Sequence, residues 1–369
     1  MKKVNIITIL DNFNFGTYLQ AFATAKTVQD LGYKAEIIAY NRPGTTVWSH
    51  YIRSLKTTYN PLKWLARTLY ALREASLKKK DLSFVSQYLS SKRYYSFNDL
   101  KYDVPIADIY MTGSDQVWNS FYNHGIDKSF YLDFVPNGKK RIAYAASIGM
   151  KNIPIEEQEP MKLLLSKYDM ITVREESSIK ILSDIGVDTE RIKVVLDPTL
   201  LLDKKCWERY ACKRLVKEQY LLVYSVEDSE KNKEVAKVAM DIARLRNLKI
   251  IGVYYGGKST SIPGCDKNFF YSTPDIFLSL LLYASFVVVS SFHGTAFSVN
   301  FMKEFVVVSP DKFNSRITNL LALLKIENRQ VVSAKNDISI LKTLDYENIH
   351  RILENERVKS LQILKLMIN

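Results

Sequence analysis

The stretch Ser290-Ser291-Phe292-His293-Gly294-Thr295-Ala296-Phe297 decides the fold of this 369-residue chain. It follows Phe286–Val289, an apolar and largely β-branched run that is typical of a buried strand in a parallel sheet. After it, apolar residues return with helical spacing. We therefore predict that His293 lies at the turn from the carboxyl end of a strand into a helix. Ligands of open α/β sheets bind at such turns, because unpaired helix N–H groups point into the crevice. The alternative is a purely structural histidine.

Strands alternate with helices along the whole chain. In the first half we predict strands at residues 4–10, 35–40, 107–111, 141–149, 170–173 and 192–196. In the second half we predict strands at residues 220–226, 249–255, 286–289 and 304–309. Helices fill the intervals, and a helical tail is expected from residue 338 to the end. This order predicts an α/β protein with two Rossmann-like domains facing a cleft, at residues 1–203 and 204–369.

Composition and motifs narrow the class of cofactor. The first strand-to-helix turn has no Gly-x-Gly-x-x-Gly sequence, which argues against NAD or FAD. Three cysteines without a Cys-x-x-Cys pair favour free thiols over a disulfide framework or a structural zinc site. We therefore expect no cofactor and no metal. No apolar stretch approaches the roughly 20 residues of a membrane span, and no cleavage site follows the apolar start, so we expect a cytoplasmic protein.

Positive charge is concentrated in residues 51–101. The whole chain has a net charge of +13, and in this segment eleven Lys or Arg residues stand against three acidic ones, a local net charge of +8. Leucines at helical spacing and aromatic side chains accompany the charge: Leu62, Leu65, Leu69, Leu72, Trp64, Tyr70 and Phe84. We predict a basic helical insert that contacts anionic membrane at its inner face, and no nucleic-acid partner. The alternative is a solvated charged face over buried aromatic residues.

Polar side chains gather where four of the predicted strands end. Asp115, Arg174 and His293 are the candidates for catalysis, because a carboxylate and an imidazole can move a proton and a guanidinium can hold an anion. The candidates for substrate binding are Asn14, Gly16, Gln20, Ser114, Gln116, Trp118, Asn119, Ser291, Phe292, Gly294 and Thr295. Trp118 could stack on a sugar ring.

These motifs, in this order, resemble the polysaccharide pyruvyl transferase family. The segments that carry the resemblance are NFGTYLQAFA at 14–23, GSDQVWN at 113–119, YLDFVPNGKKRIAYAASIG at 131–149, VREESS at 173–178, VLDPTLLL at 195–202 and SSFHGTAFS at 290–298. The resemblance implies a GT-B-like fold and transfer of a pyruvyl group from phosphoenolpyruvate (PEP) to sugar hydroxyls. The product would be a ketal on a bacterial envelope polysaccharide, and the acceptor a sugar or a lipid-linked oligosaccharide.

The resemblance also implies roles for single residues. Arg174 matches the PEP-binding arginine of the family and His293 its catalytic histidine. We expect Asp115 to act as the base toward the acceptor hydroxyl. One departure concerns Ser291, because members of the family often have the arginine of an Arg-Leu-His sequence there. Either Arg316 or Lys258 supplies the missing positive charge, or the donor differs.

Alternatives stay open for the residues and for the function. Asp115 could cap an Asx turn, Arg174 could pair with Glu175 or Glu176, and Trp118 could pack in the core. A GT-B glycosyltransferase that uses a nucleotide sugar is the competing enzyme. A non-catalytic module for anionic glycans or lipid headgroups is the competing binding protein. Release of phosphate from PEP, or of UDP from a UDP-sugar, would separate these functions.

Overall fold

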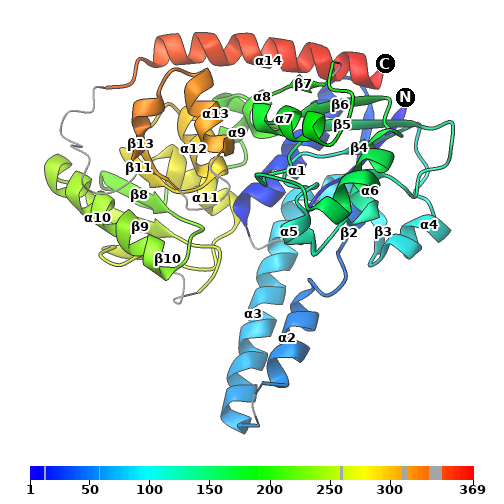
Figure 1. Ribbon diagram of the computed structural model, residues 1–369. Coiled ribbons are helices and arrows are strands. Elements are labelled where there is room, and N and C mark those ends of the chain that lie inside the picture. The colour runs from blue at the N-terminus through cyan, green and yellow to red at the C-terminus, as the bar shows by residue number, and fades with distance from the viewer. Residues whose placement is uncertain (12–13, 58, 191, 258–260, 310–314, 332–342) are drawn as a thin grey trace. The chain divides into compact units, whose positions relative to one another are not determined.

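The computed structural model describes residues 1–11, 14–57, 59–190, 192–257, 261–309, 315–331 and 343–369 (Figure 1). The chain divides into two compact units. Unit 1 contains Met1–Phe13, Thr17–Pro198 and Leu364–Asn369, and unit 2 contains Asn14–Gly16 and Thr199–Ile363. Among the residues described, no helix combines the length and the apolar character that crossing a membrane requires.

Unit 1 is built on a parallel sheet. Its described strands are β1 (Lys3–Ile7), β2 (Lys34–Tyr40), β3 (Leu89–Tyr94), β4 (Ile109–Thr112), β5 (Lys140–Ala146), β6 (Met170–Val173) and β7 (Lys193–Val194). They lie in the order β3-β2-β1-β4-β5-β6-β7, and each neighbouring pair is parallel. The order reverses between β1 and β4. Unit 1 therefore has the switch point at which doubly wound sheets bind ligands.

The helices of unit 1 follow its strands, as the alternation predicts. They are α1 (Phe15–Asp30, which begins with residues of unit 2), α2 (Val47–Leu55), α3 (Pro61–Val85), α4 (Phe97–Tyr102), α5 (Ser120–Asn123), α6 (Ile155–Leu165) and α7 (Glu176–Asp184). Short 3₁₀ turns occupy Ser86–Tyr88 and Lys128–Tyr131. The first residue of α3 is Pro61, and the Asn60 side chain accepts a hydrogen bond from Leu62 N at 2.9 Å. Both features favour a helix start.

Unit 2 repeats the same strand order. Its described strands are β8 (Tyr220–Tyr224), β9 (Lys249–Val253), β10 (Lys267–Phe269), β11 (Phe286–Val289), β12 (Glu304–Val308) and β13 (Gln330–Val331). They lie in the order β10-β9-β8-β11-β12-β13, again all parallel. The predicted central strand is β11, whose four residues are all buried. The order reverses between β8 and β11, so the switch point of unit 2 lies where β11 ends.

The helices of unit 2 cover this sheet. They are α9 (Lys204–Glu208), α10 (Ser229–Arg246), α11 (Pro274–Leu282), α12 (Phe292–Asn300), α13 (Ser315–Leu323) and α14 (Tyr346–Ile368, whose residues from Leu364 on belong to unit 1), with α8 (Pro198–Leu201) at the boundary of the units and a 3₁₀ turn at Glu327–Arg329. The expected helical tail corresponds to α14. Residues 338–342 of that expectation lie outside the described part of the chain, and residues 343–345 are not helical, because α14 begins at Tyr346.

The predicted basic insert needs a correction. A helical hairpin is present as α2 and α3, but Leu89–Tyr94, which the prediction placed in the insert, forms β3 at the edge of the sheet. Lys92 and Arg93 stand on this edge strand, where charged side chains are common because they discourage pairing with other chains. Because of these two charged residues, the segment lacks the apolar pattern by which a strand is predicted from sequence.

Candidate active site

The first group of candidate residues lies at the switch point of unit 1, where β4 ends. Asp115 has φ 73°, in the left-handed region that aspartate tolerates better than most residues. Its carbonyl accepts hydrogen bonds from Val117 N at 2.9 Å and from Ser147 N at 3.0 Å. These bonds fix the loop against the end of β5. As a result, the Asp115 carboxylate faces the guanidinium of Arg174, 3.6 Å away.

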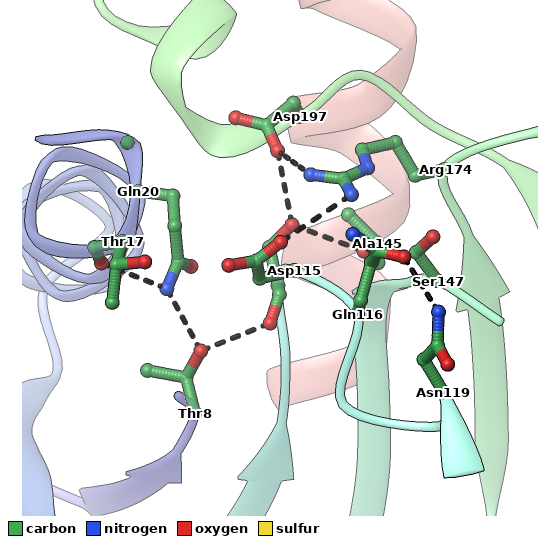
Figure 2. A network of polar contacts seen from close by, with 12 residues as sticks. Thr8, Thr17, Gln20, Asp115, Gln116, Asn119, Ala145, Ser147, Arg174 and Asp197 are labelled. Atoms are coloured by element: carbon green, nitrogen blue, oxygen red, sulfur yellow. Dashed lines mark hydrogen bonds and ion pairs between the residues drawn. The ribbon is translucent and has the colours of Figure 1, made fainter. Parts of the chain in front are cut away.

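Arg174 follows β6 and lies among three carboxylates, of which Figure 2 labels Asp115 and Asp197. Its Nη1 is 2.7 Å from Asp197 Oδ2, its Nη2 is 3.6 Å from Asp115 Oδ1, and its Nε is 3.9 Å from Glu175 Oε2. Burial on its own would lower the pKa of the guanidinium, but the negative charges of Asp197, Asp115 and Glu175 raise it above its ordinary value. Arg174 is therefore held as a buried cation.

The members of this cluster differ in how much of each side chain is exposed to solvent. The side chains of Arg174, Asp197 and Glu175 are at most 1% exposed, whereas that of Asp115 is 10% exposed. The direct bond from Arg174 to PEP that the resemblance implies stays a prediction, and the guanidinium itself is buried and surrounded by three acids. The ion-pair alternative fits it better, although the shortest contact is to Asp197 rather than to Glu175 or Glu176. Asp115 is the acid of this cluster that reaches solvent.

A chain of buried hydrogen bonds supports the cluster from below (Figure 2). Gln20 Nε2 donates to Thr8 Oγ1 at 2.8 Å, and Thr8 Oγ1 donates to the Ser114 carbonyl at 2.9 Å. Ser114 Oγ lies 3.0 Å from the Ala145 carbonyl and 3.1 Å from Asp197 Oδ2. Gln20 and Ser114, both predicted to bind substrate, are fully buried and hold the loop that carries Asp115.

Three more candidates of the same loop make contacts within the protein. Gln116 Oε1 accepts a hydrogen bond from Asn119 Nδ2 at 2.8 Å, and Asn119 Oδ1 caps α5 by accepting from Tyr122 N. Trp118 is buried, its ring stacks on Tyr131 at 5.9 Å, and its Nε1 donates to a main-chain carbonyl. The stacking on a sugar predicted for Trp118 is thus corrected, because an indole buried in the core offers no face to a ligand.

The second group of candidates lies at the switch point of unit 2. Ser291 is the N-cap of α12, and its side chain accepts a hydrogen bond from Gly294 N at 3.1 Å. The hydroxyls of Ser290 and Ser225 are 2.8 Å apart and join the ends of β11 and β8. His293 is therefore in the first turn of a helix, as predicted for the strand-to-helix turn, and it is buried. Thr295 is also buried and donates to the Ser291 carbonyl.

The segment Asn14–Gly16, which belongs to unit 2, packs directly on His293. Asn14 Oδ1 accepts hydrogen bonds from Gly16 N at 2.8 Å and from the Tyr224 hydroxyl at 3.1 Å. Phe15 stacks on Phe277 with ring centroids 4.8 Å apart. The structure thus brings Asn14, Gly16 and His293 together, although Gly16 and His293 are 277 positions apart in the sequence.

Replacement of Gly16 by alanine is expected to displace the His293 ring. A Cβ atom at position 16 would lie 2.0 Å from His293 Nδ1, which is too close for two non-bonded heavy atoms. Overpacking of this kind typically costs about 1–3 kcal/mol. We expect Gly16→Ala to lower the Tm in the wild-type background and to cost little in a His293→Ala background, where the ring is gone. Equal costs in the two backgrounds, measured by thermal unfolding, would contradict this contact.

The structure places one of the two expected sources of positive charge near Ser291. Arg316, at the start of α13, places its Cζ 5.9 Å from the ring centroid of Phe292, beside the His293 turn. Gly294 is required at this turn, because a Cβ there would lie 2.8 Å from Val289 Cγ1. The other candidate, Lys258, lies outside the described residues. Of the two, Arg316 is therefore the one that the structure places near the first turn of α12.

Sequence reasoning missed three residues of these sites. Asp197, the closest partner of Arg174, is not among the candidate residues of the sequence analysis. Thr8 follows β1 and contacts Ser114, and Tyr224 ends β8 and contacts Asn14. Burial raises the pKa of the Tyr224 hydroxyl. A general signal could have found all three, because the carboxyl ends of neighbouring parallel strands meet at one edge of a sheet.

Two sheets of Rossmann order, each with polar side chains at its switch point, define an α/β protein of the GT-B-like class. Comparison with solved structures supports this class. MnaA from S. aureus with UDP matches with a TM-score of 0.51 at 10% identity, over 96% of this chain and 88% of that one. A Listeria monocytogenes protein described as a UDP-N-acetylglucosamine 2-epimerase matches with a TM-score of 0.51 at 10% identity, over 98% and 90%. At this identity the likeness shows the fold alone, and it confirms the predicted class.

The sequence itself gives the family. The family model for polysaccharide pyruvyl transferase matches residues 14–312, a range that includes Asp115, Arg174 and His293. The chain belongs to the polysaccharide pyruvyl transferase family, as its motifs predict, and this places it among the transferases. A search of the curated proteins finds no match.

Proposed function

We propose that this protein transfers the pyruvyl group of PEP to two hydroxyls of a sugar, or of a lipid-linked oligosaccharide, as a cyclic ketal. The observation that carries the proposal is the His293 turn. An imidazole is fixed against Gly16 in the first turn of a helix, at the switch point of a Rossmann sheet, in a chain of the pyruvyl transferase family. The first turn of α12 contains no acidic residue, which favours an anionic ligand there.

The proposed reaction balances without an oxidant or a reductant. The methylene carbon of PEP takes a proton, which leaves an oxocarbenium-like centre at the carbon that bears the phosphate. One sugar hydroxyl attacks this carbon, the carbon–oxygen bond to phosphate breaks, and a second hydroxyl closes the ketal. The two hydroxyls lose two protons. One proton corresponds to the proton gained by the methyl group, and the other leaves with the phosphate.

Unit 2 supplies groups suited to the donor. PEP carries a phosphate and a carboxylate, and the first turn of a helix attracts such anions through its N–H groups and its dipole. Arg316 adds a positive charge beside Phe292. His293, in the same turn, is proposed as the acid that protonates the methylene carbon or as an anchor for the phosphate.

Unit 1 supplies the proposed base. Asp115 has the most exposed carboxylate of the buried cluster, with 10% of its side chain accessible, and its Oδ1 lies 3.6 Å from Arg174 Nη2. An ionised carboxylate can accept the proton of an attacking hydroxyl. Arg174 is then a positioning residue, because it acts through Asp115 and Asp197 rather than on the donor.

Product analysis tests the proposed function. The protein would be incubated with PEP and a panel of hexose and N-acetylhexosamine glycosides, with phosphate followed by ³¹P NMR. A parallel incubation would contain UDP-N-acetylglucosamine in place of PEP. Phosphate release that depends on an acceptor, with a ketal carbon in the product, is the expected result. Release of UDP instead would identify a glycosyltransferase, and PEP binding without turnover in any incubation would favour a binding module.

Asp115→Asn is expected to lower kcat by about 10²–10⁴-fold, the usual contribution of a general base. The affinity for PEP should stay within about twofold, because the base acts on the acceptor. Calorimetry with PEP and steady-state kinetics measure the two quantities separately. The matched control is Asp184→Asn, which removes an exposed carboxylate at the end of α7. Wild-type turnover in the Asp115 variant would remove this residue from the mechanism.

A further inference from the structure

Helices α2 and α3 form a hairpin, defined here as residues 47–57 and 59–85, that projects from the sheet of unit 1 (Figure 1). The two helices lie side by side. The Tyr51 hydroxyl is 2.7 Å from Thr68 Oγ1, and Arg67 Nη1 donates to the Ser54 carbonyl. These contacts join the middle of α2 to the first half of α3, so the hairpin is an ordered element of this unit.

The outer half of α3 presents an apolar stripe to solvent. Leu62, Leu65, Leu69 and Leu72 are spaced by three, four and three residues, which places them on one face of the helix. All four are between 51% and 77% exposed. Among the described residues of the chain, nine of the 27 exposed large apolar side chains lie between residues 48 and 72. So much apolar surface on one short element indicates an interaction site.

The exposed tryptophans of the chain also lie on the hairpin. The chain has four, and Trp118 and Trp207 are buried in the cores of their units. Trp48 on α2 and Trp64 on α3 are more than 40% exposed. Tryptophan prefers the boundary between water and a lipid bilayer, because its ring is amphipathic.

The hairpin is also strongly basic. Residues 47–85 contain eight Lys or Arg residues and two acidic residues, a local net charge of +6. The basic residues are Arg53, Lys56, Lys63, Arg67, Arg73, Lys78, Lys79 and Lys80. An apolar stripe flanked by positive charge is the pattern of helices that lie in the surface of anionic membranes.

The base of the hairpin is fixed to the unit. Ala71, Leu77, Asp81 and Val85 on α3 are buried, and Phe84 packs on Phe22 of α1 with ring centroids 5.1 Å apart. The three consecutive lysines at 78–80 are therefore not equivalent. Lys78 lies 5.9 Å from the ring of Tyr18, whereas Lys79 and Lys80 are exposed. Charge changes meant to test a surface belong at the exposed lysines.

Two occupants could cover the stripe, a second copy of this chain or an anionic bilayer. The leucine spacing matches the first two heptads of a coiled coil, but stable coiled coils need about three or four. Pairing two hairpins would also bring two elements together that each have a net charge of +6, and these charges would repel each other. An anionic lipid surface meets the positive charge with negative charge and accepts the leucines and tryptophans in its interface. Charge complementarity favours the bilayer.

We propose that the hairpin of α2 and α3 docks this protein reversibly on anionic phospholipid bilayers, through the leucine stripe of α3, Trp48 and the exposed lysines. This function is separate from the proposed pyruvyl transfer, and its test needs no substrate.

Vesicle flotation with the full chain tests the proposal. Vesicles of phosphatidylcholine alone are compared with vesicles that contain roughly one-third phosphatidylglycerol, at about 50 mM and about 500 mM salt. We expect binding to the anionic vesicles at low salt, and at least about tenfold weaker binding at high salt or to neutral vesicles. The test variant is K63E/K79E/K80E, and we expect it to lower binding to anionic vesicles by about tenfold or more.

The matched control is K34E/K139E/K151E, which makes the same change in charge at exposed lysines outside the hairpin. This control should bind nearly as well as the wild type. Leu65→Ser with Leu69→Ser should weaken binding while circular dichroism stays unchanged. No binding to anionic vesicles at low salt, or equal losses in the two lysine variants, would overturn the proposal. So would a lipid-free dimer in sedimentation velocity that the two serine substitutions dissociate, because the second copy would then cover the stripe.

Discussion

His293→Ala is expected to lower kcat by about 10²–10⁴-fold, the range that a lost acid or base usually costs. The imidazole lies in the first turn of α12 at the switch point of unit 2, in contact with Gly16. Because the residue is buried, its removal also leaves a cavity, and some loss of Tm accompanies the loss of turnover. Turnover is therefore measured per folded molecule, with the folded fraction taken from thermal unfolding.

His350→Ala provides the comparison. This residue lies in α14 of unit 2, and burial lowers the pKa of its imidazole. We expect its variant to lose stability and to keep its turnover per folded molecule. A His293 variant that behaves in the same way would show that His293 is structural.

Arg174→Met is expected to destabilise unit 1 by about 3–5 kcal/mol, the usual cost of leaving a buried charge without its partner. Removing the guanidinium leaves Asp197 and Glu175 buried without a counter-charge, and Asp115 without its neighbour. Chemical unfolding followed by circular dichroism measures the loss. The double variant Arg174→Met/Asp197→Asn should recover part of it, because it removes the closest charge and can keep the contact with Ser114.

PEP affinity distinguishes the two roles considered for Arg174. A positioning residue leaves the affinity of the folded variant nearly unchanged, whereas a donor anchor lowers it and leaves stability intact. Calorimetry with PEP on Arg174→Met, at a temperature where the variant is folded, measures this directly. A variant as stable as the wild type with lost PEP affinity would restore the role that the resemblance implies.

Much of the fold could be predicted from local patterns. The buried run at Phe286–Val289 and the small residues after it predict the β11–α12 turn, and the structure has both elements there. A parallel strand with two neighbours is apolar along its whole length, which makes it visible in a sequence. The edge strand β3 is not, because one of its sides is open and it carries Lys92 and Arg93.

The site was less predictable, because its contacts join distant parts of the chain. The sequence offers Glu175 and Glu176 as partners of Arg174, since they are its neighbours, but the register of the sheet brings in Asp197. Gly16 shows no sign in the sequence of its contact with His293. Trp118 illustrates the reverse case, in which a residue type common in sugar sites serves the core.

The four crossings of the chain between the units limit how this protein could be divided. A single cut after Pro198 would leave the second half without Phe15, whose ring packs against Phe277, Tyr224 and Tyr255. The first half would lack Leu364–Asn369, which belong to its own unit. Neither fragment therefore contains all the residues of its own unit. Fusions or chimaeras with relatives would have to exchange residues 14–16 together with the second half, and to return the last six residues to the first.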